Sequence, residues 1–207
     1  MLLVHHLENS RSQRVLWLLE ELGLPYEVRR YERDRKTMLA PAALKRVHPL
    51  GKAPIVEDDG TVVVETGAIV EYLIEKADGR LGAPPRREDF LRYRHFLHYA
   101  EGSMMPPLLA LLVVHRLGLL GRPAKKPIQR MLDVHLDWLE SELAARPWFA
   151  GEHFTAADIM MSFPIEASRA RGGLTSSRPN LLDWLERVHA RPAYGIALAR
   201  GGPYAYA

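Results

Sequence analysis

The chain has 207 residues, of which 47% are apolar and 26% are charged, and its formal net charge is +3 at pH 7. This composition is typical of a globular protein with a buried core and excludes wholesale disorder. The chain has no cysteine, so disulfides, thiolate metal sites and a cysteine nucleophile are excluded, and any thiol must come from a ligand. No signal peptide is apparent, and the longest later apolar run, residues 108–114, is far shorter than the ~20 residues of a membrane span. We therefore expect a cytoplasmic protein.

The first third of the sequence predicts alternating strands and helices. Residues 2–7 suit a strand, and residues 9–12 offer polar side chains that suit a helix N-terminus. Apolar residues then recur at helical spacing over residues 15–22, until Gly23 ends the helix. Residues 26–31 suit a second strand, which predicts a parallel β-α-β unit with a right-handed crossover.

Further elements complete this half of the chain. Residues 37–47 suit a short helix, and Asp59 and Gly60 between β-branched runs predict a hairpin of two strands. Another helix follows from Thr66. Residues 1–78 thus read β-α-β-(α)-β-β-α, which is the order of a thioredoxin-like α/β domain.

The rest of the sequence predicts helices alone. Residues 79–85 are rich in Gly and Pro and suit a linker, so residues 86–207 are expected to form an all-α helical-bundle domain. The prolines at 106–107 should kink or break its first long helix. Thr155 and Asp158 have the spacing of a capping box at the start of a later helix.

Basic side chains cluster over residues 29–36, but acidic residues alternate with them. Alternating signs do not build a strong field for phosphates, so we interpret this run as a solvated face. With no membrane-spanning run either, we expect neither nucleic acid nor a membrane as a partner.

The N-terminus of the first helix is the first candidate site. Backbone N–H groups are unpaired there, and the helix dipole favours negative charge. A hydroxyl at this point can donate a hydrogen bond to a bound thiolate, and Arg11 adds positive charge nearby. A fall in a thiol pKa from ~8.5 to ~6.5 would raise the thiolate share at pH 7 from ~3% to ~75%. Alternatively, Ser10 or Ser12 only caps the helix, a role that does not exclude catalysis.

Two other segments suit the binding of a peptide-like ligand. An ordinary trans bond is the more frequent state before Pro54, but a cis bond would expose the backbone of Ala53 to an extended guest. Glu65 and Thr66 can cap the next helix, or Thr66 can bind an α-carboxylate at its N-terminus while Glu65 accepts from an ammonium. Lys52 could meet a further carboxylate. Together these residues describe a groove for an extended, zwitterionic peptide that carries a thiol.

With these features the sequence resembles the cytosolic glutathione transferase superfamily over nearly all of its 207 residues. The resemblance is greatest to bacterial members with a serine-type, theta-like active site. It implies a thioredoxin-like domain that binds glutathione as co-substrate and a helical domain that offers the second substrate. The segments that carry the resemblance are HLENSRSQRVLWLLEEL at residues 6–22, PLGKAP at 49–54, ETGAI at 65–69, FTAADI at 154–159 and RPAY at 191–194.

The resemblance also implies a catalytic residue. Ser10 lies four residues before Arg14, as the catalytic serine lies before the matching residue in theta-like members. Ser10 is therefore expected to donate a hydrogen bond to the glutathione thiolate, with Arg11 adding positive charge. Asn9 and Ser12 are the alternatives, because a one-residue difference in the loop changes which side chain points inward.

For the rest of glutathione, the resemblance implies three contacts. Pro54 should be cis, with Ala53 pairing with the cysteinyl backbone. Glu65 and Thr66 should hold the γ-glutamyl end, and Lys52 should meet the glycyl carboxylate. The family often has a larger aliphatic residue before the proline, and Ala53 departs from that while keeping the backbone role.

The second substrate, a hydrophobic electrophile, is expected between the two halves. Methionines suit an adaptable apolar pocket, although at helical spacing each candidate is more often a core residue. His95 and His98 lack a third ligand, so no metal is expected. The candidates for the pocket are Tyr99, Ser103, Met104 and Met105.

The resemblance implies a cytoplasmic, homodimeric glutathione transferase that conjugates glutathione to an electrophile in detoxification. A glutathione-dependent peroxidase or reductase is an alternative, although the absence of cysteine disfavours a mixed disulfide with the protein. A non-catalytic binding or scaffold protein with the same fold is another, since a fold does not fix a reaction.

Overall fold

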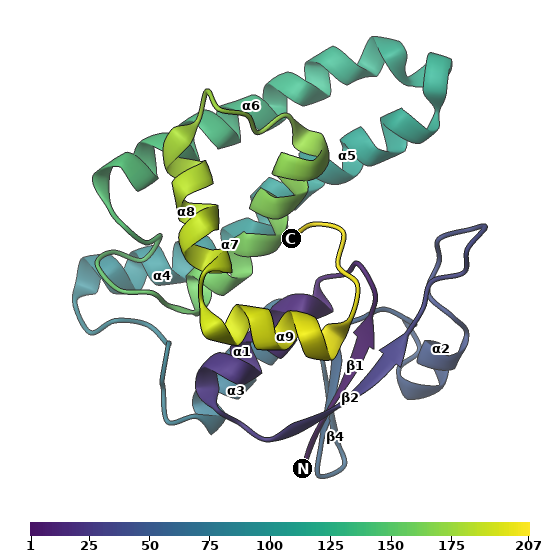
Figure 1. The fold of residues 1–207 in the computed structure, drawn as a ribbon, viewed down its shortest axis with the longest axis vertical. Helices are drawn as coiled ribbons and strands as arrows, with labels where there is room; N and C mark the ends of the chain where they lie inside the picture. The colour runs from purple at the N-terminus through teal and green to yellow at the C-terminus, as the bar shows by residue number, and fades with distance from the viewer. The chain divides into compact units, whose positions relative to one another are not determined.

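The computed structural model describes all 207 residues, which fold into two compact units. The first unit comprises Met1–Gly82 together with His189–Ala205 and Ala207, and the second comprises Ala83–Val188 and Tyr206. Figure 1 shows the chain from its purple N-terminus to its yellow C-terminus.

A four-stranded mixed sheet lies in the first unit. Its strands are β1 (Leu2–Leu7), β2 (Tyr26–Tyr31), β3 (Ile55–Asp58) and β4 (Thr61–Val64), in the order β2-β1-β3-β4. Strand β1 runs parallel to β2 and antiparallel to β3, which forms the predicted hairpin with β4. This topology confirms the thioredoxin-like fold that the sequence predicts.

Helices α1 (Ser12–Leu22), α2 (Ala43–Val47) and α3 (Thr66–Lys76) complete the predicted element order. Nearly every side chain of α1 is buried, and α1 packs against both the sheet and α3. The helix ends at Gly23, whose φ of 60° suits glycine and whose N–H donates to the carbonyl of Glu20.

The last helix, α9 (Pro192–Gly201), also packs against α1. Arg191, just before α9, donates two hydrogen bonds to the carboxylate of Glu21, at 2.6 and 2.8 Å. The rings of Trp17 and Tyr194 meet edge to face at 5.2 Å. These contacts attach the end of the chain to the helix that begins at the candidate site.

The grouping of α9 corrects a predicted domain boundary. From the sequence, residues 86–207 are expected to form the helical domain, whereas the structure groups His189–Ala205 with the first unit. Helical periodicity predicts that a segment is a helix, but it does not identify the surface that its apolar face will meet.

The second unit is helical, as predicted. Strands are absent from it, and the chain turns between successive helices through short loops and single helical turns. Its elements are α4 (Arg87–Tyr99), η1 (Ala100–Met104), α5 (Met105–Arg116), η2 (Gly118–Gly121), α6 (Arg122–Ala145), α7 (Ala156–Ala167), η3 (Ser168–Gly172) and α8 (Pro179–His189).

The predicted interruption at the two prolines takes the form of a π-helical turn. Pro106 and Pro107 have no N–H groups, so the carbonyls of Gly102 and Ser103 lose their usual partners. The chain widens into η1 before the prolines and resumes as α5, with proline in its first turn. The whole helical run Arg87–Arg116 is apolar enough by length and composition to cross a membrane, a test that a core helix also passes.

The predicted capping box begins α7. The N–H of Thr155 donates to the carboxylate of Asp158 at 3.0 Å, and the reciprocal bond is present. The other carboxylate oxygen of Asp158 accepts from the N–H of Phe149 and from the indole of Trp184. Burial raises the pKa of Asp158 to about 6, while these donors favour its charged form. One side chain therefore joins the start of α7 to the preceding loop and to α8.

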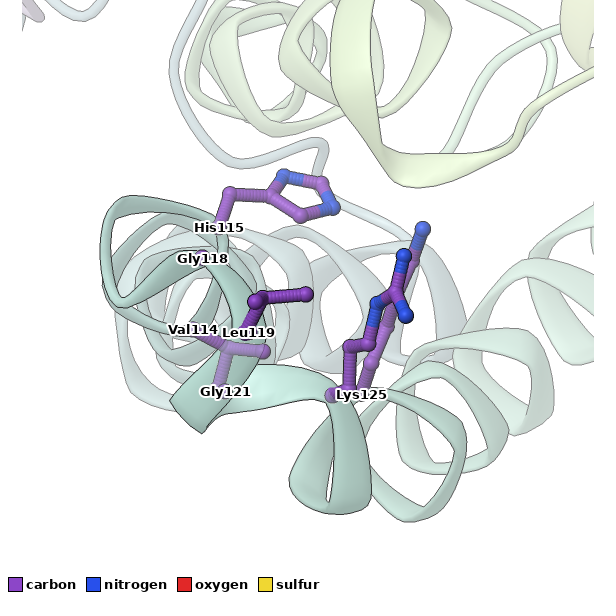
Figure 2. A pocket seen from close by; sticks show the side chains of 7 residues that line it. Val114, His115, Gly118, Leu119, Gly121 and Lys125 are labelled. Carbon is purple, nitrogen blue, oxygen red and sulfur yellow. The ribbon is translucent and has the colours of Figure 1, made fainter.

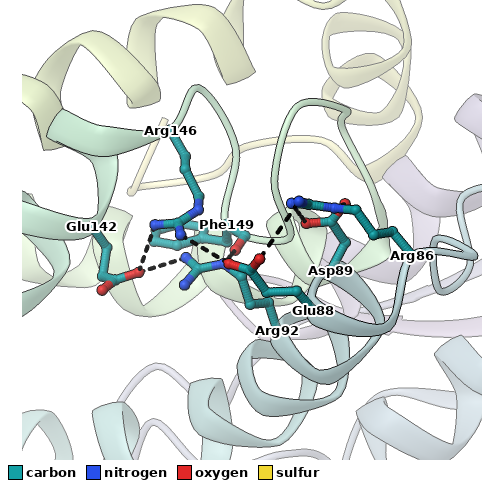
Figure 3. Close-up of polar contacts among 7 residues, drawn as sticks. All are labelled: Arg86, Glu88, Asp89, Arg92, Glu142, Arg146 and Phe149. Atoms are coloured by element: carbon teal, nitrogen blue, oxygen red, sulfur yellow. Dashed lines mark hydrogen bonds and ion pairs between the residues drawn. The ribbon is translucent and has the colours of Figure 1, made fainter.

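Ion pairs join α4 to α6 (Figure 3). Arg92 donates to Glu142 at 2.5 Å and to the carbonyl of Phe149 at 3.1 Å. Arg146 contacts Glu88 at 3.1 Å. Surface pairs of this kind contribute little to stability individually, and their main effect here is to fix the position of the first turns of α4.

Candidate functional site

Three loops that carry the predicted site residues leave the same end of the sheet. His5 of β1 lies opposite Ile55 of β3, and Ile55 lies opposite Val64 of β4. The C-terminal ends of β1 and β4 and the N-terminal end of β3 therefore lie at the same end of the sheet. We call this end of the strands the shared edge. This edge brings together the loops at residues 8–12, 52–54 and 65–66.

Ser10 and Ser12 form a buried pair at the start of α1. Their Oγ atoms lie 2.7 Å apart, and the N–H of Ser12 donates to the Oγ of Ser10 at 3.2 Å. Ser10 thus accepts the N–H of the first residue of α1, while Arg11 occupies the N-cap position and no side chain caps the helix from there. Ser12 is completely buried, whereas 6% of Ser10 remains exposed. Of the two residues, Ser10 is the one that reaches the surface.

His6 of β1 extends this network. Its Nδ1 lies 2.9 Å from the Oγ of Ser12, which also accepts the N–H of Leu7 at 3.1 Å. Burial, and then the nearby charge of Arg30, lowers the pKa of His6 to about 4, so the ring is neutral at pH 7. The Nε2 side of the ring faces Gly201 of α9, and the ring donates to that backbone. The Nδ1 of His6 is therefore an acceptor, as is the carbonyl of Leu7, which lies 3.2 Å from the same Oγ of Ser12.

These hydrogen bonds determine the direction of the Ser10 hydroxyl. A serine hydroxyl has one proton, and that of Ser12 has two acceptors within reach, the Nδ1 of His6 at 2.9 Å and the carbonyl of Leu7 at 3.2 Å. The oxygen of Ser12 can then only accept from Ser10. Ser10 is consequently a donor, and an anion on its exposed side would compete for the same proton.

Two contacts hold the loop between β1 and α1. Asn9 has a φ of 50°, and its Oδ1 accepts the N–H of Ala205 at 2.7 Å. The guanidinium of Arg33 donates to the carbonyl of Glu8 at 3.1 Å, and the carboxylate of Glu8 accepts the N–H of Arg33 at 2.8 Å. The amide oxygen of Asn9 is therefore bound to the C-terminal segment. Arg11 follows at the N-cap of α1 and is partly exposed.

The peptide bond between Ala53 and Pro54 is cis, as the resemblance implies. Pro54 is buried immediately before β3, and Ala53 is half-buried. Lys52 is exposed next to them. The loop thus presents a backbone segment and a cation at the same edge of the sheet as Ser10.

Glu65 has an unusual backbone conformation at the start of α3. Its φ of 71° and ψ of 125° are rare for a residue with a Cβ atom and cost about 1–3 kcal/mol. Its side chain is exposed and makes no capping hydrogen bond, so the capping interpretation does not apply to it. Thr66 follows as the buried first residue of α3. The strained residue therefore adjoins a helix N-terminus, where backbone N–H groups favour an anion.

The four residues predicted for a second-substrate pocket lie in different surroundings. Met104 is completely buried and Met105 is 5% exposed, as in the core-packing alternative. Tyr99 and Ser103 line a shallow hollow of about 430 Å³ beside α4. The hydroxyl of Tyr99 lies 2.5 Å from Nδ1 of His135. Burial raises the pKa of Tyr99 and lowers that of His135, so the tyrosine donates to a neutral imidazole.

His95 belongs to an aromatic cluster on α4 and α6. Its ring stacks on Tyr99 at 5.2 Å and meets the rings of Phe96 and Trp138 edge to face. Burial lowers its pKa. The structure contains no group of three His, Asp or Glu side chains that could hold a metal ion.

Two features of the site were not predicted from the sequence. One is the role of His6 behind Ser12, for which the only signal is a pair of histidines, His5 and His6, in a strand whose other residues are apolar. The other is the conformation of Glu65, for which the sequence gives no signal, since glycine would be the expected residue at a positive φ.

The chain matches the family description of the glutathione S-transferase N-terminal domain over residues 10–76, and that of the C-terminal domain over residues 123–187. It is 37% identical to glutathione S-transferase 3 of Schizosaccharomyces pombe, over 95% of this chain and 86% of that protein. It is 29% identical to glutathione S-transferase 1 of Saccharomyces cerevisiae, over 94% of this chain and 92% of that protein.

A solved structure gives the same result. The crystal structure of a glutathione S-transferase from Actinobacillus pleuropneumoniae superposes with a TM-score of 0.89 at 31% identity, covering 100% of this chain and 95% of that one. The likeness extends over both units, and it does not assign the chain to the bacterial serine-type subgroup. The chain belongs to the glutathione S-transferase family.

Proposed function

We propose that the protein is a glutathione transferase that binds glutathione at the shared edge of the sheet and conjugates its thiol to an electrophile. The observation that carries the proposal is the direction of the Ser10 hydroxyl. It is a donor at the N-terminus of a buried helix, on the loop that resembles the catalytic loop of the family. The family membership of the whole chain supports the same activity.

The proposed role of Ser10 is to stabilise the thiolate of glutathione. The hydroxyl turns from Ser12 to the sulfur, while the N–H of Ser12 and the bonds to His6 hold both oxygens in place. The N-terminus of α1 and the charge of Arg11 favour the anion further. A thiol pKa lowered by about two units gives about 25 times more thiolate at pH 7. Catalysis is then mostly activation of the nucleophile and proximity.

The remaining contacts to glutathione follow from the other two loops. The backbone of Ala53 beside the cis Pro54 would pair with the cysteinyl residue as an added strand does. Thr66 and the first N–H groups of α3 would bind the α-carboxylate of the γ-glutamyl end, and Glu65 would accept from its ammonium. Lys52, which is exposed, would meet the glycyl carboxylate.

The second substrate is expected to be a hydrophobic electrophile, which would contact α4 and the π-helical turn that follows it. Tyr99 and Ser103 are the candidates with exposed surface there, whereas Met104 supports them from the core. We expect the protein in the cytoplasm, because cytosolic glutathione is kept as a thiol. The family resemblance supports a homodimer with a role in detoxification.

Direct reduction of a peroxide by bound glutathione is a second candidate, because it uses the same thiolate. The absence of cysteine disfavours reductase mechanisms that pass through a mixed disulfide with the protein. A panel of aryl halides, epoxides and organic peroxides separates the two reactions.

The test is an ultraviolet titration of the thiolate of bound glutathione in the wild type and in Ser10→Ala. We expect a thiol pKa about two units below that of free glutathione, and a return toward the free value in Ser10→Ala with about 25-fold lower conjugation at pH 7. Ser141→Ala, at an exposed serine of α6, is the matched control and should behave as the wild type.

Full conjugating activity in Ser10→Ala would remove the role assigned to Ser10. Failure of the wild type to bind millimolar glutathione would instead favour a scaffold protein with this fold.

A further inference from the structure

The hairpin segment at residues 102–132, which includes α5, η2 and the first turns of α6, contains basic residues and no acidic ones. Five of the 28 Lys and Arg residues and none of the 25 Asp and Glu residues lie between Glu101 and Asp133, which leaves 23 basic and 25 acidic residues elsewhere. Residues 102–132 therefore carry a net charge of +5, which exceeds the net surplus of +3 of the whole chain. All five cations are exposed, namely Arg116, Arg122, Lys125, Lys126 and Arg130.

The same hairpin exposes large apolar side chains at its turn, residues 117–121, which we call the hairpin tip. Leu119 is 73% exposed and Leu120 is 85% exposed, and Leu117 before them is 52% exposed. Single exposed leucines are ordinary on protein surfaces, but three within four residues, flanked by cations, form a patch that suits an interaction site.

The backbone holds this tip in a fixed form. Gly118 has a φ of 57°, and a side chain at Gly121 would overlap the carbonyl of Val114. In Figure 1 the hairpin extends past α7 and α8, with which it shares the second unit. His115 and Lys125 both line a hollow of about 370 Å³ at the tip. Figure 2 shows their side chains, which come from the two arms of the hairpin.

We propose that the hairpin tip binds the surface of an anionic lipid bilayer. Leu119 and Leu120 would enter the boundary between headgroups and acyl chains, and the five cations would lie among the lipid phosphates and carboxylates. The hollow between His115 and Lys125 would receive one headgroup. Surface binding of this kind needs no membrane-spanning segment.

A bilayer fits this surface better than a nucleic acid does. Residues 105–132 contain no Phe, Trp or Tyr on which bases could stack. Adjacent exposed leucines gain nothing from a phosphate backbone, whereas an acyl region buries them. The first acidic residue after the tip, Asp133, is paired with Arg178 at 3.4 Å and therefore leaves the cationic surface uncompensated.

The affinity for the bilayer should depend on both the basic side chains and the exposed leucines of the hairpin tip. Each basic residue near an anionic bilayer raises the partition coefficient by about fivefold. Burial of one leucine side chain raises it by about tenfold. The contact is therefore expected to be reversible, sensitive to salt and absent on neutral lipid.

The experiment is co-sedimentation of the full chain with vesicles of phosphatidylcholine and phosphatidylserine in a two-to-one ratio. We expect binding at low ionic strength and its loss in about 1 M salt, where the Debye length is about 3 Å. Lys125→Glu with Lys126→Glu should lower the partition coefficient by at least about 25-fold, and Leu120→Ser by about tenfold.

Matched controls change the same charge and the same side chain elsewhere. Arg35→Glu with Lys36→Glu alters two exposed cations of the first unit, and Leu39→Ser alters a leucine that is 62% exposed. Both controls should bind as the wild type. Equal losses in the control and tip variants, or equal binding to pure phosphatidylcholine, would overturn the proposal. Binding to single-stranded oligonucleotides without binding to vesicles would overturn it in favour of a nucleic-acid partner.

Discussion

The N-termini of α1 and α3 face the same candidate site, but their first turns are held in different ways. At α1, the hydroxyls of Ser10 and Ser12 and the ring of His6 form a buried chain of hydrogen bonds. At α3, no side chain caps the helix, and Glu65 is held at a positive φ. A hydrogen-bonded network fixes the direction of a proton, whereas a strained residue fixes the direction of a side chain and leaves the helix end open to a ligand.

This difference matches the two proposed tasks. The thiolate needs one donor at a defined position, and a network with a fixed direction supplies it. The zwitterionic end of glutathione needs free N–H groups and a carboxylate beside them, which a capped helix would not offer. The two helix ends should therefore respond differently to substitution.

The largest expected effect concerns the pH dependence of stability at the α1 network. The pKa of His6 is lowered to about 4 in the fold, against 6.5 in the unfolded chain. Between these values the unfolded chain binds more protons, so the free energy of unfolding falls as pH decreases from 6.5 to 4. The expected loss from this residue is at most about 3 kcal/mol. Denaturant titrations across this pH range measure it.

Substitution distinguishes this contribution from general acid denaturation. In His6→Gln the free energy of unfolding should depend less on pH between 4 and 6.5. In His153→Gln, at an exposed histidine, the dependence should stay as in the wild type. The same slope in both variants would show that the Nδ1 of His6 is not held neutral by the fold.

Removal of Ser12 should weaken both stability and activity. In Ser12→Ala the N–H of Leu7 loses its acceptor in a buried position, which costs about 1–3 kcal/mol of unfolding free energy. The Ser10 Oγ also loses one of the two contacts that hold it in position, so we expect conjugation to fall by about fivefold with a partly raised thiol pKa. Unchanged thiol titration in a destabilised Ser12→Ala would show that the network is structural only.

At α3 the expected effect is on affinity. Glu65→Ala removes a charged acceptor for the γ-glutamyl ammonium, and we expect the Kd for glutathione to rise by about tenfold, with an unchanged pKa of the bound thiol. Isothermal titration calorimetry measures the affinity. Glu71→Ala, at an exposed glutamate on the same helix, is the control. A changed thiol pKa in Glu65→Ala would contradict the division of tasks between the two helices.

The sequence was sufficient to predict much of this arrangement. Hydrophobic periodicity and the Asp-Gly turn give the element order, and the sheet register then places Ser10, Ala53 and Glu65 at one edge. The capping box at Thr155 was predictable because its chemistry is local.

The features that were not predicted depend on tertiary structure. Helix α9 packs on α1, and hydrophobic periodicity does not indicate which of several apolar surfaces a helix will contact. The pairing of His6 with Ser12 depends on how closely β1 approaches α1. The positive φ of Glu65 opposes the intrinsic preference of the residue, and only the surrounding structure imposes it.

The smallest expected effect tests that strain directly. In Glu65→Gly the backbone can adopt a φ of 71° without a steric penalty, while Glu65→Ala keeps the penalty of the Cβ atom. Both variants lose the carboxylate, so both should bind glutathione equally weakly. Their stabilities should differ. The free energy of unfolding should be about 1 kcal/mol higher for the glycine variant than for the alanine variant, because relief of strain exceeds the entropy cost of glycine. A glycine variant that is less stable than the alanine variant would show that Glu65 is not strained, and the open N-terminus of α3 would then need a different explanation.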